Sequence, residues 1–128
     1  MGYSNVIDYI TIASTGNATD FGDLSTGTAH KAGCCDETRA IAGGGHTGSL
    51  TNRIDYLTIA TTGNSGDFGD LTVSKHGMGA CSGSTRGCFG GKDGGTDVIE
   101  YVTIQTTGNA ADFGDLTTNI AQSTGTAA

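Results

Sequence analysis

The residues that could do chemistry in this chain are few and scattered. The candidates for metal ligands or nucleophiles are Cys34, Cys35, Cys81, Cys88, His30, His46 and His76. The Cys-x-x-Cys spacing that specifies a zinc site is missing, and the histidines are best explained as surface residues. No nucleophile, base and orienting group stand out together. The sequence therefore predicts neither a metal site nor a catalytic centre.

Two of the cysteines are expected to face each other. Cys81 and Cys88 flank a predicted hairpin centred on Ser84 and Thr85, which places them opposite one another on paired strands. Cross-strand Cα atoms lie about 4.5–5.5 Å apart, which overlaps the range for a disulfide. Free buried thiols are the preferred interpretation, because the preceding copy has Ile41 where this one has Cys88. A disulfide is the alternative.

The acidic residues belong to a repeat. The stretch Asp-Phe-Gly-Asp-Leu begins at residues 20, 67 and 112. Asn17, Asp20 and Asp23, with their copies, offer oxygen ligands for calcium, but the EF-hand spacing and its closing Glu are absent. A better explanation is that the Asn residues lie in turns and the Asp residues cap backbone amides. Arg39 and Arg86 also recur, and are expected to form ion pairs with repeated acids of neighbouring units.

The elements that must position these residues follow from the repeat. Residues 53–61 carry β-branched and aromatic side chains on both faces, which predicts a strand that is covered on both sides. A turn over 62–66, a short strand around 68–73, a small-residue strand over 77–83 and a strand over 86–91 complete the period. Four short strands in about 45 residues predict an all-β fold, the β-propeller. A parallel β-helix would need shorter coils.

The repeat resembles the kelch repeat. Kelch blades close their second strand with a double glycine, which Gly43-Gly44 and Gly90-Gly91 match. They continue with an aromatic residue beside an acid and end with an aromatic-x-x-Leu strand. The matching aromatic residues are Tyr9, Tyr56 and Tyr101, and then Phe21, Phe68 and Phe113. The chain departs from the family in having Phe where kelch repeats usually have Trp, and in its shorter, glycine-rich loops. The resemblance implies four-stranded kelch-like blades.

The chain contains an incomplete set of blades. In kelch order, residues 3–25 supply a half-blade, 28–72 and 75–117 supply one blade each, and 119–128 aligns with an inner strand. Propellers close with roughly four to eight blades, so just under three blades leave apolar faces and strand edges open. We expect oligomerisation to complete the ring, with a homodimer of six blades favoured. Another homo-oligomer, a filament or a larger polypeptide is the alternative.

Composition and charge exclude some classes of function. The formal net charge is −7, which disfavours nucleic acid as a partner. The acids occupy mainly the repeated positions, so the charge is largely a by-product of the repeat. No apolar run approaches the ~20 residues needed to span a bilayer, and no secretory signal is visible. We expect no membrane partner. The sequence leaves the compartment open, and both a virion and the cytoplasm are compatible with it.

The repeat accounts for nearly every unusual residue and leaves little over for catalysis. The sequence therefore predicts a non-enzymatic structural, assembly or adhesion module without a cofactor. Its near-identical, Gly- and Thr-rich copies are similar in style to bacteriophage virion structural proteins, so a virion or surface component fits. A lectin-like propeller that binds carbohydrate or peptide is the alternative, and a metal-dependent oxidase-type propeller is a third. If binding occurs, the unequal loops point to His46, Lys92 and Asp93.

Overall fold

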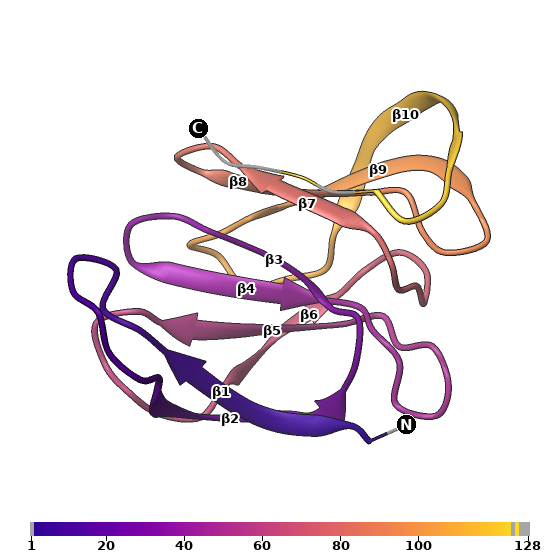
Figure 1. The fold of residues 1–128 in the computed structure, drawn as a ribbon. Helices are drawn as coiled ribbons and strands as arrows, with labels where there is room; N and C mark the ends of the chain where they lie inside the picture. The colour runs from indigo at the N-terminus through magenta and orange to yellow at the C-terminus, as the bar shows by residue number, and fades with distance from the viewer. Residues whose placement is uncertain (1, 124, 126–128) are drawn as a thin grey trace.

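The chain forms three small antiparallel β-sheets that are stacked in layers (Figure 1). This computed structural model describes residues 2–123 and 125. The first sheet pairs β1 (Ser4–Tyr9) with β2 (Thr19–Thr28). The second contains β3 (Ala32–Cys35), β4 (Arg39–Gly43), β5 (Arg53–Thr58) and β6 (Gly66–Asp70). The third contains β7 (Gly79–Ser82), β8 (Arg86–Gly90), β9 (Thr96–Thr103) and β10 (Ala111–Ile120).

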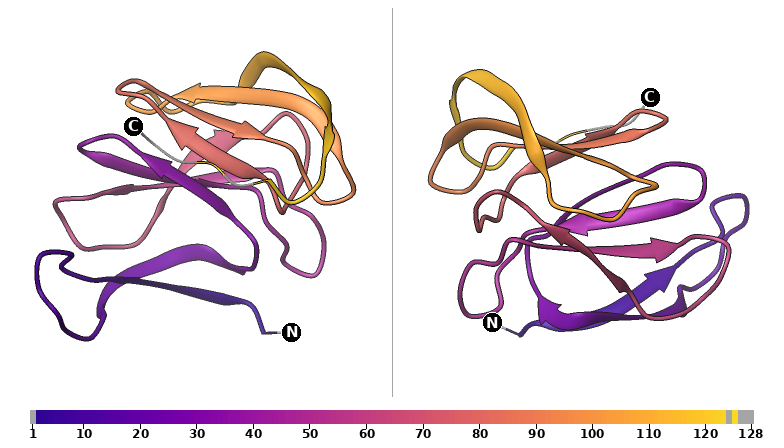
Figure 2. Two further views of the ribbon diagram at one scale, coloured as in Figure 1. Left: turned by 45° about the horizontal axis from the view of Figure 1, so that its top comes forward. Right: turned by 180° about the vertical axis from the view of Figure 1, so that it is seen from behind.

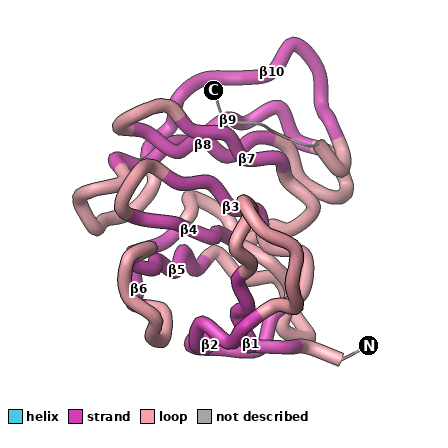
Figure 3. The backbone as a smooth tube through the Cα atoms, turned by 60° about the vertical axis from the view of Figure 1, so that its left-hand side comes forward, coloured by secondary structure: helices cyan, strands magenta, loops and turns pink. Residues whose placement is uncertain are grey.

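The predicted all-β fold class is confirmed. The second and third sheets each pair their four strands in chain order, so one period of the repeat makes one antiparallel sheet. The first strands of these two sheets, β3 and β7, contact each other, and Figure 3 shows the layers from the side. The first and third sheets lie at opposite ends of the stack (Figure 2). The described residues contain no helix long and apolar enough to cross a membrane.

The double glycines end a strand and permit a close contact. Gly43 is the last residue of β4, and a Cβ at this position would lie 3.1 Å from the ring of Phe89 in the next sheet. Gly44 follows with φ 65°, a left-handed conformation that disfavours other residues. Gly91 has φ 75° after β8. The repeated pair therefore combines close packing with a change of chain direction.

The hydrophobic core lies within and between the second and third sheets. Its fully or nearly fully buried members include Ile41, Ile54, Phe68, Phe89 and Ile104. Among the described residues, no buried hydrophobic side chain precedes Ala32. The two-stranded first sheet therefore contributes a surface to the stack but no buried apolar side chain to its centre.

Three isoleucines at the same repeat position show how burial depends on the neighbouring sheet. Ile12 is 94% exposed, Ile59 is 43% exposed and Ile104 is fully buried. Ile104 faces the complete second sheet, where Arg39 donates a hydrogen bond to its carbonyl oxygen at 3.0 Å. Ile59 follows β5 of the second sheet, and the sheet that precedes its own has only two strands. No described sheet precedes Ile12, so burial increases with the completeness of the preceding sheet.

The aromatic residues predicted to be structural pair within each sheet. Tyr9 meets Phe21, Tyr56 meets Phe68 and Tyr101 meets Phe113, each edge to face with ring centroids 5.9, 6.2 and 5.9 Å apart. Of the three repeated Phe side chains, only Phe68 is buried, with 2% of its surface exposed. Phe21 is half-buried, and Phe113 is 54% exposed because no further sheet is stacked beyond β10.

The predicted ion pairs of the repeated arginines are wrong. The Arg39 guanidinium stacks over the Tyr56 ring at 4.5 Å, and that of Arg86 over Tyr101 at 4.4 Å. Neither forms a salt bridge within the described part of the chain. The planar guanidinium can lie flat on an aromatic face of the adjacent strand. The repeated Arg thus stacks within its own sheet, and Arg39 also donates to the Ile104 carbonyl after β9 of the third sheet.

The segment 119–128, which the sequence predicts to form an inner strand, lies partly outside the described residues. Asn119 and Ile120 continue β10. Ser123 lies in no strand, and its hydroxyl accepts a hydrogen bond from the Gly79 N–H and donates one to the Gly90 carbonyl. Residues 124 and 126–128 lie outside the described residues. The described part of this segment therefore contacts its own sheet.

Replacing Ile104 by Ala should lower the free energy of unfolding by about 2–5 kcal/mol, because it removes a fully buried side chain. The matched change Ile59→Ala affects a side chain that is already 43% exposed and should cost about 1 kcal/mol or less. Urea denaturation followed by circular dichroism measures both variants. Equal costs at the two positions would contradict the burial gradient.

Candidate functional site

The sheets are joined by a repeated contact between a turn and a strand. The turn after β5 lies against β2: Gly63 N–H donates to the Phe21 carbonyl at 2.8 Å, and Asn64 Oδ1 accepts from the Asp23 N–H at 3.0 Å. Ser65 N–H donates to the Asp23 carbonyl at 2.8 Å. We call this set of hydrogen bonds the joint. It connects the first sheet to the second.

The joint recurs between the second and third sheets with the same atoms. Gly108 N–H donates to the Phe68 carbonyl at 2.7 Å, and Asn109 Oδ1 accepts from the Asp70 N–H at 3.0 Å. Ala110 N–H donates to the Asp70 carbonyl at 2.8 Å. Identical sequence at the strand and at the turn therefore produces an identical connection between layers.

The glycine of Asp-Phe-Gly-Asp makes the joint possible. A Cβ on Gly22 would lie 2.3 Å from the Gly63 carbonyl oxygen, and one on Gly69 would lie 2.4 Å from the Gly108 oxygen. Both distances are far below van der Waals contact. Both glycines also have φ near 145°, which other residues rarely adopt. The repeated glycine is therefore required by an approach of backbone to backbone.

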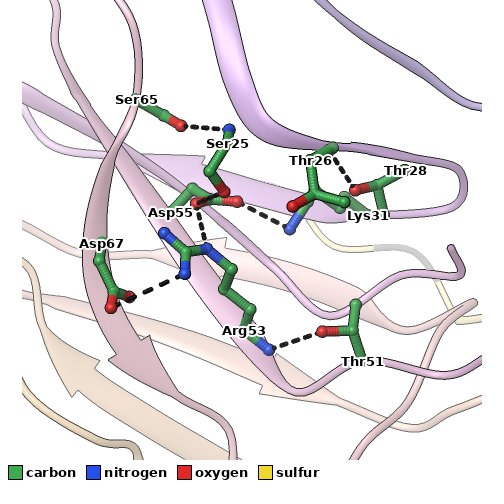
Figure 4. A network of polar contacts seen from close by, with 9 residues as sticks. All are labelled: Ser25, Thr26, Thr28, Lys31, Thr51, Arg53, Asp55, Ser65 and Asp67. Atoms are coloured by element: carbon green, nitrogen blue, oxygen red, sulfur yellow. Dashed lines mark hydrogen bonds and ion pairs between the residues drawn. The ribbon is translucent and has the colours of Figure 1, made fainter.

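Each pair of joined sheets also shares a buried carboxylate. Asp55 on β5 is 2% exposed and is contacted from both sheets (Figure 4). The Ser25 hydroxyl donates to it at 3.1 Å, the Lys31 ammonium lies 3.1 Å away, and the Arg53 Nε donates at 2.8 Å. Burial lowers the pKa of Lys31, and the charge of Asp55 opposes this shift. The cations thus compensate a carboxylate that has lost its water.

The second carboxylate, Glu100, is fully buried together with Lys75. Their side-chain atoms Oε1 and Nζ lie 2.5 Å apart, outside hydrogen-bond geometry, so the contact is best described as a charge–charge attraction. Oε2 accepts from the backbone N–H of Thr72 at 2.8 Å and from its hydroxyl at 2.6 Å. Thr72 and Ser25 both follow the Leu of the repeated stretch. The hydroxyl, the acid and a lysine therefore recur together.

The residues predicted for binding lie at the end of the sheets where β4 and β8 finish. His46 and Asp93 are brought together through His76. The His46 and His76 rings are 5.7 Å apart by centroid, and His76 Nε2 lies 3.8 Å from Asp93 Oδ2. Lys92 is next to this group in sequence, and its backbone N–H donates to the Ile120 carbonyl.

The three histidines form a cluster that the sequence did not predict. His30 also stacks near His76, with centroids 5.6 Å apart, and the Tyr3 hydroxyl lies 2.9 Å from His46 Nδ1. These residues do not occupy equivalent repeat positions, so no pattern in the sequence indicates that the loops meet. Within the described part of the chain, no group of three or more His, Cys, Asp or Glu is placed to hold a metal ion.

A cleft of about 680 Å³, lined mainly by polar residue types, opens at the other end, beside the turns that follow β3 and β7. Asp36 lies at its edge and accepts hydrogen bonds from the backbone of Thr38 and Arg39 and from the Gln105 amide. These bonds, with the one from Gln105 the largest contribution, lower the pKa of Asp36 to about 2. None of the lining residues is aromatic. The carboxylate thus holds the hairpin turn to the third sheet.

The cysteines are free thiols in the structure, but the expected burial is wrong: Cys35 and Cys81 are exposed, and Cys34 and Cys88 are only half-buried. Cys81 and Cys88 are directly opposed on β7 and β8, which confirms the predicted register. Burial raises the pKa of Cys34 to about 12 and also raises that of Cys88. A thiol with a raised pKa is protonated at neutral pH and is a poor nucleophile.

Comparisons with known proteins identify no relative. No protein-family model matches the sequence, and no curated protein matches it significantly.

Replacing Glu100 by Gln should destabilise the fold by about 3–5 kcal/mol, because it leaves the Lys75 charge buried without its counter-ion. Gln retains an oxygen that can accept from Thr72. The control Asp67→Asn removes an exposed acid that lies 3.8 Å from Arg53, and should change stability by about 0.5 kcal/mol or less. Thermal and urea unfolding measure both. A Glu100→Gln cost as small as that of the control would contradict the proposed compensation.

The stability contributed by Asp36 should depend on pH. Its pKa in the folded protein is about 2, below the ordinary value of about 3.9 in an unfolded chain. The carboxylate therefore stabilises the fold above about pH 4, and this contribution is lost as the pH falls towards about 2. The difference in unfolding free energy between wild type and Asp36→Asn should shrink over this interval. A difference independent of pH would contradict this role of Asp36.

Proposed function

We propose that the protein is a non-enzymatic structural module that assembles through the two ends of its stack. The observation that carries this proposal is the distribution of exposed apolar side chains. In the first sheet and the turn after it these are Tyr3, Val6, Tyr9, Ile10 and Ile12. At the other end, Phe113 and Ile120 of β10 are exposed. Three of these residues, Ile10, Ile12 and Phe113, have a buried copy elsewhere in the chain, at Val102, Ile104 and Phe68.

Such surfaces favour association. Clustered apolar side chains on a water-soluble protein commonly mark a contact with another molecule. The first sheet adds a second reason, because β1 pairs only with β2. Its equivalent β5 pairs with strands on both sides. The outer edge of β1 therefore offers backbone groups to a further strand, a feature that proteins usually cover.

The form of assembly that we favour is a ring of kelch-like blades closed by two chains. The two four-stranded sheets have the strand order of propeller blades, and the first sheet has the two strands of a half-blade. Two copies would then supply six blades. A virion or surface component is a setting in which such a module would serve as scaffold or adhesion unit. The lectin-like alternative has less support, because the cleft beside Asp36 has no aromatic residue for stacking on a sugar.

Light scattering after size-exclusion chromatography tests the assembly. We expect a mass of twice that of the chain, or a larger multiple if the contact continues into a filament. The mass should fall on dilution in the presence of a mild denaturant that leaves the circular dichroism spectrum unchanged. A protein that remains monomeric over a wide range of concentrations would contradict the proposed function.

A further inference from the structure

We propose that the chain binds a second copy of itself by a third joint, in which the turn at residues 15–18 of one copy lies against β10 of the other. This inference rests on the proposed assembly function and assigns the residues that would carry it. Its template is the joint that occurs twice within the chain. Both halves of a third joint are present in this sequence, at opposite ends of the stack (Figure 2).

The accepting half is the third copy of Asp-Phe-Gly-Asp-Leu, on β10. Gly114 has φ 140°, close to Gly22 and Gly69, so its backbone already has the conformation of an occupied joint. A Cβ at Gly114 would meet nothing within 4 Å, whereas at Gly22 and Gly69 it would collide with the neighbouring turn. Phe113 is 54% exposed, against 2% for Phe68. The accepting strand is thus formed and uncovered.

The donating half is the first copy of the turn. Thr15-Gly16-Asn17 repeats the Thr-Gly-Asn of the two turns that form joints. Residues 15–18 are exposed and make no hydrogen bond to another sheet within the described part of the chain. By analogy, Gly16 N–H would donate to the Phe113 carbonyl, and Asn17 Oδ1 would accept from the Asp115 N–H.

The buried carboxylate that accompanies each internal joint has an equivalent residue for the third joint. Asp8 is the equivalent of Asp55 and Glu100 but is exposed. Thr117 is the equivalent of Thr72, whose N–H and hydroxyl bind Glu100, so Thr117 would donate to Asp8 of the second copy. Residues 118–123 contain no lysine. The intermolecular joint is therefore expected to be weaker than the internal ones, because Asp8 would lack the cation that Lys31 and Lys75 provide.

The described end of the chain fits this arrangement. The incoming first sheet has only two strands, so it would leave the outer face of β7 and β8 uncovered. Ser123 binds Gly79 and Gly90 at this face. A pocket there is lined by Cys88, Gly125 and neighbouring residues of the third sheet. The described residues Ser123 and Gly125 thus lie at strands that the second copy would leave uncovered.

The two halves cannot meet within one chain, because the first and third sheets are separated by the second (Figure 1). A contact between two different surfaces is heterologous, and it closes into a ring or continues into a filament. This property gives the proposal a test that a contact between two identical surfaces would fail.

The experiment uses one variant for each half. Asn17→Ala removes the side chain that would accept from Asp115, and Phe113→Arg places a charge where the neighbouring sheet would cover an apolar ring. Each variant alone should bind itself at least about tenfold more weakly than wild type, corresponding to about 1.4 kcal/mol. An equimolar mixture should regain a dimer, because the intact turn of the Phe113→Arg chain can join the intact β10 of the Asn17→Ala chain. Sedimentation velocity measures all four samples.

Matched controls separate this effect from misfolding or general surface changes. Glu37→Gln and Leu50→Arg alter exposed residues outside the joint and should assemble like wild type. Circular dichroism checks the fold of each variant. If the Phe113→Arg variant does not fold, the Thr117→Val variant takes its place. If wild type assembles and both single variants assemble equally well, or if their mixture regains no dimer, the third joint is wrong while the assembly function stands. A monomeric wild type overturns both.

Discussion

The layered structure depends on one close approach, that of a turn carbonyl over a strand glycine. The Gly63 oxygen lies only 2.3 Å from where a Cβ of Gly22 would be, and the Gly108 oxygen lies 2.4 Å from the corresponding position at Gly69. This approach brings the Asn64 amide within reach of the Asp23 N–H. It also sets the spacing at which the carboxylate of the following sheet meets the hydroxyl of the preceding one. A side chain at the strand glycine would separate the layers and remove both contacts.

Because the joint is made between repeats, no repeat is complete by itself. Repeat proteins gain stability from the interfaces between neighbouring units, and the isoleucine series shows this directly. Ile12, Ile59 and Ile104 occupy the same repeat position, each after a Thr, yet their exposure falls from 94% to 43% to none. The first sheet is thus held by its neighbour and has no buried apolar side chain of its own among the described residues. Stability in this chain is a property of the stack.

The sequence predicts what lies within a sheet better than what lies between sheets. The four strands per period and the facing of Cys81 and Cys88 follow from local alternation and hairpin geometry. The partner of Asn64 does not, because a turn residue gives no indication of which strand it will contact. The histidines converge for the same reason: their loops belong to different sheets and have no common pattern. The placement of Arg39 over Tyr56 was not predicted, because the repeated acids of neighbouring units favoured an ion pair for the repeated arginine.

The charges show how a repeat adapts to unequal surroundings. The acid beside the aromatic residue is copied three times, but its need for a cation is not, because only a buried carboxylate loses its hydration. Asp55 has Lys31 and Glu100 has Lys75, each supplied by the segment that follows the preceding sheet. Asp8 is exposed and water can solvate it. Lys31 and Lys75 therefore occur where stacking buries the acid. The positions of these two lysines, more than those of the repeated acids, indicate which layers are in contact.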